Sequence, residues 1–187
     1  MLISATVFLG CIGTRQISVE TDYARSCKRI KTTFPFGYAL ERFSPLQRWS
    51  QTVVKDLCAD SSQTYHIYDI LELRSESFLL DSIVCVIADG ISAVARIERF
   101  ESVNKRVVDE NRRDILTADS TKLSVVTSYN YRMYREYKIV YSLSVATAEQ
   151  IRQSQSVKYQ YYAGHDMITI ALSDAQLKRF KLLIDMR

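Results

Sequence analysis

Residues 129–172 read YNYRMYREYKIVYSLSVATAEQIRQSQSVKYQYYAGHDMITIAL and hold eight of the twelve tyrosines of this 187-residue chain. Over residues 129–146 the odd positions are mostly apolar or aromatic and the even positions mostly polar, which is typical of a strand with one dry face. An unbroken strand of that length would span about 60 Å, too long for a domain of this size. We therefore expect a break near residues 135–136, where a hairpin loop is preferred over a coiled, bent strand.

The alternation changes phase later in the same stretch, because the apolar positions are odd before Gly164 and even after it. A two-residue turn at Gly164-His165 explains the change, and glycine in the first position suits a type II′ turn. That turn pairs the apolar residues of two strands: Tyr161 with Ile168, Tyr159 with Ile170 and Val157 with Leu172.

A second hairpin is predicted at Asp89-Gly90, a dipeptide that favours a type I′ turn. The turn follows a nearly continuous apolar run over residues 78–88, and pairing should continue to Phe100. The register again brings apolar residues together: Ala88 with Ile91, Val86 with Ala93 and Val84 with Ala95. Alternation over residues 65–73 and residues 3–9 predicts two further strands. For the uncharged N-terminus, a buried strand is preferred over a signal peptide.

Helical spacing is found in three places. Thr21 is a candidate N-cap for a helix with Tyr23, Cys27, Ile30 and Phe34 on one face, ending before Pro35. Ser44-Pro45-Leu46-Gln47 has the form of a capping box, and Leu46, Trp49, Val53 and Leu57 would line the second helix as far as about residue 60. A second capping box at Ser173 predicts a C-terminal helix whose inward residues are Leu177, Phe180 and Ile184.

These elements predict one α+β domain over residues 1–187, a twisted antiparallel β-sheet with two helices of the N-terminal half and one C-terminal helix packed on it. The most polar segment, residues 101–120, balances its basic and acidic clusters. A short surface helix or a mobile loop would explain it.

The sequence offers little for chemistry. Its two histidines, His66 and His165, stand in no metal-binding spacing, and no phosphate-binding or nucleophile motif occurs. We therefore expect no catalytic residues, no metal and no cofactor. Cysteines occur at positions 11, 27, 58 and 85 with no CxxC pair. Reduced, buried thiols in a cytosolic protein are preferred over disulfides. No run is long enough for a membrane-spanning helix.

Charge is uneven along the chain, whose formal net charge is +4. Residues 1–56 hold eight Lys and Arg against four Asp and Glu, and residues 57–187 hold seventeen of each. The polar face of the first expected helix carries Arg25, Lys28, Arg29 and Lys31, which could meet the phosphates of nucleic acid or anionic lipid head groups. A merely solvated face is the alternative.

The tyrosines at the odd positions of residues 129–146 share their face with Met, Ile, Leu and Val, so core packing or a subunit interface is favoured over base stacking. Tyr129, Tyr131, Tyr137 and Tyr141 are thus the candidates for self-association.

The order of these elements resembles the folded part of rhabdovirus-type matrix proteins: an early strand, two helices, antiparallel strands including residues 137–145, and a closing strand–helix unit. The chain departs from that family in having only Pro35 and Pro45, and no PPxY motif. The resemblance implies a non-enzymatic viral structural protein of the virion and host cytoplasm that self-associates and bridges nucleocapsid to anionic membrane. The expectation is thus an intracellular, membrane-associated protein that is not secreted. The alternatives are a module that binds RNA or single-stranded nucleic acid, and a ligand-binding or enzymatic α+β domain.

Overall fold

A computed structural model describes residues 17–38, 44–74, 79–116 and 121–187. Over these ranges the chain forms nine strands and two helices. The strands are β1 (Ser18–Asp22), β2 (Cys27–Tyr38), β3 (Leu46–Cys58), β4 (Gln63–Leu73), β5 (Ile83–Ala88), β6 (Ile91–Leu116), β7 (Lys122–Leu143), β8 (Val157–Ala163) and β9 (Asp166–Ala171), and the helices are α1 (Val145–Gln153) and α2 (Asp174–Asp185).

All neighbouring strands are antiparallel, in the order β1-β2-β3-β4-β7-β6-β5-β8-β9. β6 changes partner along its length: its first six residues pair with β5, and from Ile97 onward it pairs with β7. A register shift between Ile97 and Arg99 marks the change, and such a bulge bends a strand. The sheet thereby folds over itself, and side chains from both parts of it form one buried cluster.

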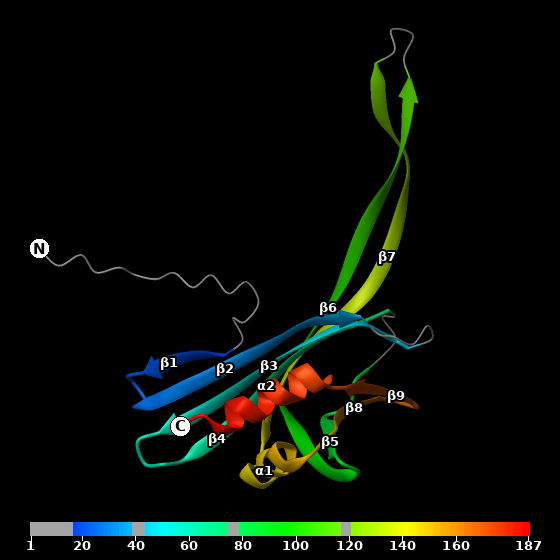
Figure 1. Cartoon of the computed structure of the whole chain (residues 1–187). Coiled ribbons are helices and arrows are strands. Elements are labelled where there is room, and N and C mark those ends of the chain that lie inside the picture. Colours follow the sequence, from blue (N-terminus) through cyan, green and yellow to red (C-terminus); the bar gives the residue numbers. More distant parts are fainter. Residues whose placement is uncertain (1–16, 39–43, 75–78, 117–120) are drawn as a thin grey trace, which may run out of the picture.

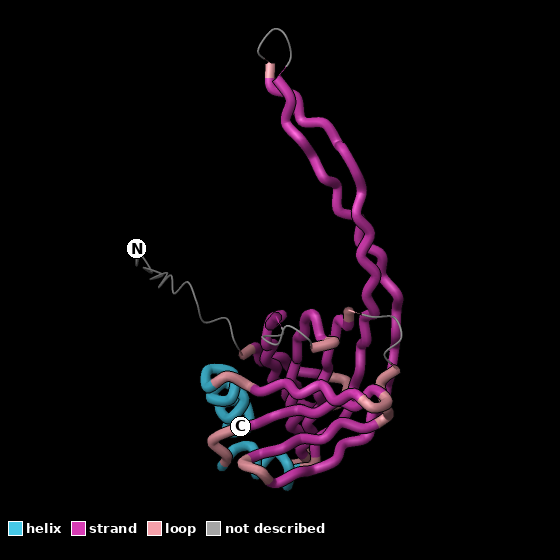
Figure 2. Tube along the Cα trace, turned by 90° about the vertical axis from the view of Figure 1, so that its right-hand side faces the viewer, coloured by secondary structure: helices cyan, strands magenta, loops and turns pink. Residues whose placement is uncertain are grey.

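The two helices lie together at one side of the folded sheet (Figures 1 and 2). α2 packs against β2 and β3, and α1 packs against α2 and β4. The Ser173 capping box forms as expected, and Leu177, Phe180 and Ile184 are buried. Lys55 of β3 donates to the carbonyl oxygens of Ile184 (2.6 Å) and Met186 (2.8 Å), and so supplies a cation to a helix end that has no basic residue of its own.

The expected α+β class is wrong, because both helices of the N-terminal half are strands, β2 and β3. Side chains four residues apart lie on one face of a helix and also on one face of a strand, so the spacing from Ile30 to Phe34 fits either. Ile30, Thr32 and Phe34 are buried and Lys31 and Thr33 are not, which is the two-residue period. β3 is buried on both faces, and this hides its alternation.

Three other expectations about elements are confirmed. The Asp89-Gly90 hairpin has the expected register, and positive φ at both turn residues (48° and 84°) fits type I′. The Gly164 hairpin pairs Tyr161 with Ile168 and Tyr159 with Ile170, and Gly164 has φ 63°. The predicted strand over residues 65–73 is part of β4.

Two strands are much longer than expected. Residues 101–116 are neither helix nor loop but the second half of β6. β7 runs without a break from Lys122 to Leu143, so the hairpin preferred near residues 135–136 does not exist. So long a strand fits in this protein because β6 and β7 extend together far beyond the rest of the molecule (Figures 1 and 2). α1 was not predicted, although Ser144 caps it by accepting from the Thr147 N–H at 3.0 Å.

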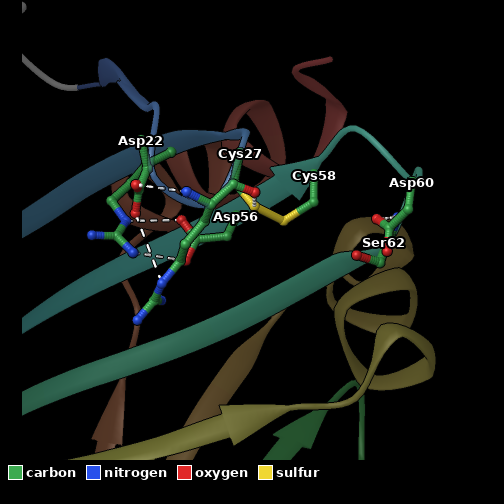
Figure 3. Close-up of a disulfide and its surroundings, with 8 residues drawn as sticks. Asp22, Cys27, Asp56, Cys58, Asp60 and Ser62 are labelled. Carbon is green, nitrogen blue, oxygen red and sulfur yellow. Dashed lines mark hydrogen bonds and ion pairs between the residues drawn. A yellow bond between two sulfur atoms is a disulfide. The ribbon is translucent and has the colours of Figure 1, made fainter.

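The cysteine expectation is also wrong for two of the four thiols. Cys27 and Cys58 are direct cross-strand neighbours on β2 and β3 and form a disulfide (Figure 3). Cys85 is a buried free thiol. Cys11 and the strand expected at residues 3–9 lie outside the described residues. The disulfide removes the argument from reduced thiols for a cytosolic setting.

Candidate functional site

The four basic residues expected on one helix face lie on a turn and a strand. Arg25 is in the turn before β2, and the other three are on β2. Because successive strand residues point to opposite faces, Lys28 shares a face with buried Ile30, whereas Arg29 and Lys31 lie on the other face. The structure therefore does not gather these four cations into one surface.

Each of the four has an acceptor within the chain. The Asp56 carboxylate accepts two hydrogen bonds from Arg29, which raises the pKa of this guanidinium. The partners are Arg25 with Asp22 (3.9 Å), Lys28 with the Arg187 carbonyl oxygen (2.5 Å), Arg29 with Asp56 (2.8 Å) and Lys31 with Glu20 (3.5 Å). Figure 3 shows Asp56 beside the disulfide. Most of the positive charge expected here is thus balanced locally.

Arg25 and Arg29 nevertheless line one pocket, of about 400 Å³, across the face of β2, β3, β4, β7 and β6. Arg99 and His66 join them, and Asp56 and Glu98 lie in the same wall. His66 is held by a 2.9 Å hydrogen bond between its Nδ1 and Ser142 Oγ. The mixed charges of this pocket favour no single class of ligand.

The four candidate tyrosines for self-association fall into two pairs. Tyr137 and Tyr141 are completely buried within the chain's own core, so their side chains contact no second molecule. Tyr129 and Tyr131 expose 52% and 56% of their surface. Both exposed tyrosines lie where β7 has left the rest of the molecule.

This outer part of β6 and β7 is called the arm here, and it comprises residues 105–116 and 122–134; the other described residues form the body. The two strands pair with each other from Lys105 and Tyr134 to Leu116 and Lys122. β4 pairs with β7 only from Arg135 onward, so among the described residues no third strand joins the arm. Twelve residues of strand reach about 40 Å.

The base of the arm is firmly attached to the body. Lys105 and the buried Glu136 form an ion pair, and Arg135 donates to Asn104 Oδ1 at 2.8 Å. Just inside the body, the rings of Phe100 and Tyr137 lie 5.2 Å apart. The arm therefore leaves the body in a defined direction, because the last shared rungs of the sheet are packed and paired.

The arm itself exposes many apolar side chains. In water a ribbon of only two strands is marginally stable, and exposed apolar clusters mark interaction surfaces. The most exposed are Val108, Ile115, Leu116, Leu123, Val125, Tyr129, Tyr131 and Met133. Arg106 lies over the Tyr131 ring, 3.9 Å from its centroid, a cation–π contact that stiffens one face.

Ion pairs cross the arm between its two strands. Lys122 Nζ lies 2.7 Å from Asp114 Oδ2, and Arg132 Nε donates to Asp109 Oδ2 at 2.7 Å. Both basic side chains of β7 in the arm thus reach toward β6. Exposed pairs of this kind contribute only about 0–1 kcal/mol each to stability. Their main effect is to hold the positive groups of Lys122 and Arg132 toward β6.

A buried polar cluster lies in the body, far from these surfaces. The Tyr161 hydroxyl donates to Asp69 Oδ2 at 2.6 Å, and burial raises the pKa of Asp69 to about 6. The Gln51 amide, Asp69 Oδ1 and the Tyr159 hydroxyl have no hydrogen-bond partner among the described atoms. Every one of these residues is at most 2% exposed. The cluster therefore affects stability, since it is closed to solvent.

Within the described ranges there is no group of three or more His, Cys, Asp or Glu side chains arranged to hold a metal ion. Neither helix seen in those ranges is long and apolar enough to cross a bilayer.

The chain matches no protein-family model, no curated protein and no solved structure. The two early helices on which the resemblance to matrix proteins depended are strands.

Sequence reasoning missed the arm. The available signal was the alternation of residues 129–146, which carries no turn residue where the break was expected. The alternative of one continuous strand, which was rejected because of its length, is the one that leads to an extended ribbon.

Proposed function

We propose that this chain is a non-enzymatic structural protein that self-associates through its arm. The observation that carries the proposal is a ribbon of about 40 Å that leaves the body and exposes apolar side chains on both strands. A second copy that covers these side chains would remove apolar surface from water at about 25 cal/mol per Å².

The arm is too well anchored for a flexible tail. Lys105, Glu136 and the packed Phe100–Tyr137 pair fix where it starts. Rigid presentation lowers the entropy lost when a partner binds. A long projection with a fixed base that exposes aromatic and β-branched side chains is well suited to an assembly contact.

The bridging role between nucleocapsid and anionic membrane, expected from the sequence, does not enter this proposal. It depended on one cationic helix face, and Arg25, Lys28, Arg29 and Lys31 are instead divided between a turn and two faces of β2, each with an acceptor.

A second candidate function is binding of single-stranded nucleic acid by the arm. The arm holds six basic and three acidic residues, and its exposed Tyr129 and Tyr131 could stack with bases. Self-association is favoured because four of the six cations are paired with carboxylates: Lys105, Arg112, Lys122 and Arg132.

The test compares the full chain with a chain that lacks most of the arm. Residues 106–133 are replaced by Asn-Gly, which closes a type I′ turn between the paired Lys105 and Tyr134 and keeps the Lys105–Glu136 ion pair. Light scattering across a protein concentration series should show dimers or larger species for the full chain and monomers for the truncated chain. A full chain that stays monomeric at high concentration would sink the proposal.

Mobility shift of a single-stranded oligonucleotide, measured over a salt series with the same two proteins, tests the second candidate. Binding that needs the arm and weakens steeply with salt, in a chain that stays monomeric, would replace self-association by nucleic-acid binding.

A further inference from the structure

The two outer edges of the arm differ in charge. On β6, seven of the twelve arm residues are charged, in the sequence KRVVDENRRDIL. On β7, residues 123–131 read LSVVTSYNY, nine residues with no charge and many β-branched or aromatic side chains. The backbone groups along this edge meet no other strand in the part of the chain that the structure describes.

The charges that border the uncharged edge are turned away from it. Lys122 and Arg132 stand at its two ends, and each pairs with a carboxylate of β6, Asp114 and Asp109. An incoming strand therefore meets a row of backbone donors and acceptors between neutral side chains. Natural proteins protect free edges with charge, proline, short length or β-bulges. Over these nine residues the β7 edge has one such feature, the bulge at Thr127, where the register with β6 shifts.

We infer that this edge pairs antiparallel with the same segment of a second copy, about a two-fold axis. The inference rests on the proposed self-association and names its seam. Pairing would give a four-stranded ribbon in the order β6-β7-β7-β6, and additional strands stabilise an otherwise marginal hairpin. A two-fold contact uses one patch on both copies, so the uncharged segment of each copy meets that of the other.

Charge supports a second arm as the partner. Four of the six cations of the arm lie on β6, and pairing through β7 leaves the two β6 strands about 14 Å apart at a strand spacing near 4.8 Å. That distance exceeds the Debye length of about 8 Å at physiological salt. Pairing through β6 would instead bring the seven charged side chains of each copy, four basic and three acidic, into the seam.

Length also supports it. The partner must be an extended strand without charge over about the same length. The other free edges among its described strands are β1, β9 and residues 32–38 of β2, which lie beyond the end of β1 and include Pro35. β1 has five residues and carries Glu20 and Asp22, and β9 offers five uncharged residues after Asp166. Of these free edges, only that of residues 123–131 offers nine uncharged residues to a second copy of itself.

The first test adds one lysine to either edge of the same rung. Ser128 and Asn111 are cross-strand partners, and the Asn111 side chain donates to Ser128 Oγ at 2.9 Å. Ser128→Lys and Asn111→Lys each remove that hydrogen bond and add one positive charge, so they differ only in the edge they block. Ser128→Lys should raise the dimer Kd roughly tenfold or more, because it puts two positive charges diagonally across the seam, one residue from the two-fold axis at residue 127, and Asn111→Lys should not.

The second test is cross-linking. Ser128→Cys should give dimers linked by a short bifunctional thiol reagent, because the two copies of residue 128 lie about 8 Å apart on either side of the two-fold axis at residue 127, too far for a direct disulfide. With Cys11 changed to Ser in every protein, Asn111→Cys on the outer strand should give no more dimer than the chain without it, in which Cys27 and Cys58 are bonded and Cys85 is buried.

The outcomes separate the two proposals. If the full chain associates but the two lysine variants weaken it equally or not at all, or Ser128→Cys cross-links no better than Asn111→Cys, the β7 seam is refuted while self-association stands. Loss of association with Thr169→Lys alone would place the seam at β9 and likewise refute it. A monomeric full chain overturns both.

Discussion

Tyr131 and Tyr141 lie on one strand and on the same alternating positions of the sequence, yet their surroundings are opposite. Tyr141 is fully buried between the two parts of the folded sheet, whereas Tyr131 exposes 56% of its surface on the arm. The body uses its apolar alternation to close its own core. The arm continues the same alternation with nothing in the described chain to cover it. A two-residue period in the sequence therefore indicates a strand, but it does not indicate what covers the apolar face of that strand.

The largest expected effect comes from truncating one tyrosine of each kind. Tyr137→Ala removes a fully buried ring packed on Phe100 and should lower the free energy of unfolding by about 3–5 kcal/mol. Tyr131→Ala should change it by about 0.5 kcal/mol or less and weaken dimerisation instead. Both changes in unfolding free energy are measured by urea unfolding, at a protein concentration low enough that further dilution no longer changes the midpoint. Equal losses would mean that the arm packs on the body.

The disulfide provides a second contrast, because Cys27–Cys58 joins β2 and β3, two strands of the body (Figure 3). It closes a loop with a sequence separation of 31 residues, and the chain-entropy model gives about 3–4 kcal/mol for that length. Reduction, or Cys27→Ser with Cys58→Ser, should lower stability by that amount. The dimer Kd of the folded protein should stay the same. A Kd that changes on reduction would show that self-association also depends on the part of the body that holds β2 and β3.

Part of this fold could be predicted from the sequence. Turn chemistry fixed both hairpins, since Asp89-Gly90 and Gly164 favour one geometry each. The Ser173 capping box fixed α2 for the same local reason. β2 and β3 could not be predicted from spacing alone, because residues four apart share a face in either structure. Their β-branched content, as at Val53-Val54, was the signal that would have decided.

The candidate site was harder to predict because the arm differs from the body only in that no other described strand pairs with it. The sequence grouped Tyr129 and Tyr131, which are exposed, with Tyr137 and Tyr141, which are buried in the core. No local pattern separates the pairs. The burial of the β7 tyrosines depends on β4, which pairs with β7 only from Arg135 to Leu143. The sequence of β7 does not indicate where this neighbouring strand ends.

The smallest expected effect is a pH dependence confined to the body. Because burial raises the pKa of Asp69 to about 6, from an ordinary value of 3.8, the folded state binds a proton more tightly than the unfolded state. Stability from this group is therefore fully present below about pH 4 and is lost as the pH rises to about 6, by on the order of 2–3 kcal/mol. Asp69→Asn keeps an acceptor for the Tyr161 hydroxyl and removes the titration.

The measurement is the difference in unfolding free energy between the unmodified chain and Asp69→Asn from pH 4 to 8. The difference cancels the carboxylates whose pKa values are lowered by hydrogen bonds, such as Asp60 and Asp89, which act in the opposite direction. The variant should gain relative stability as the pH rises and level off above about pH 7. The dimer Kd should be the same in both proteins at every pH, because no group of the Asp69 cluster reaches the arm. A Kd that followed the Asp69 titration would show that the core of the body and the arm are coupled, and would end the division between them.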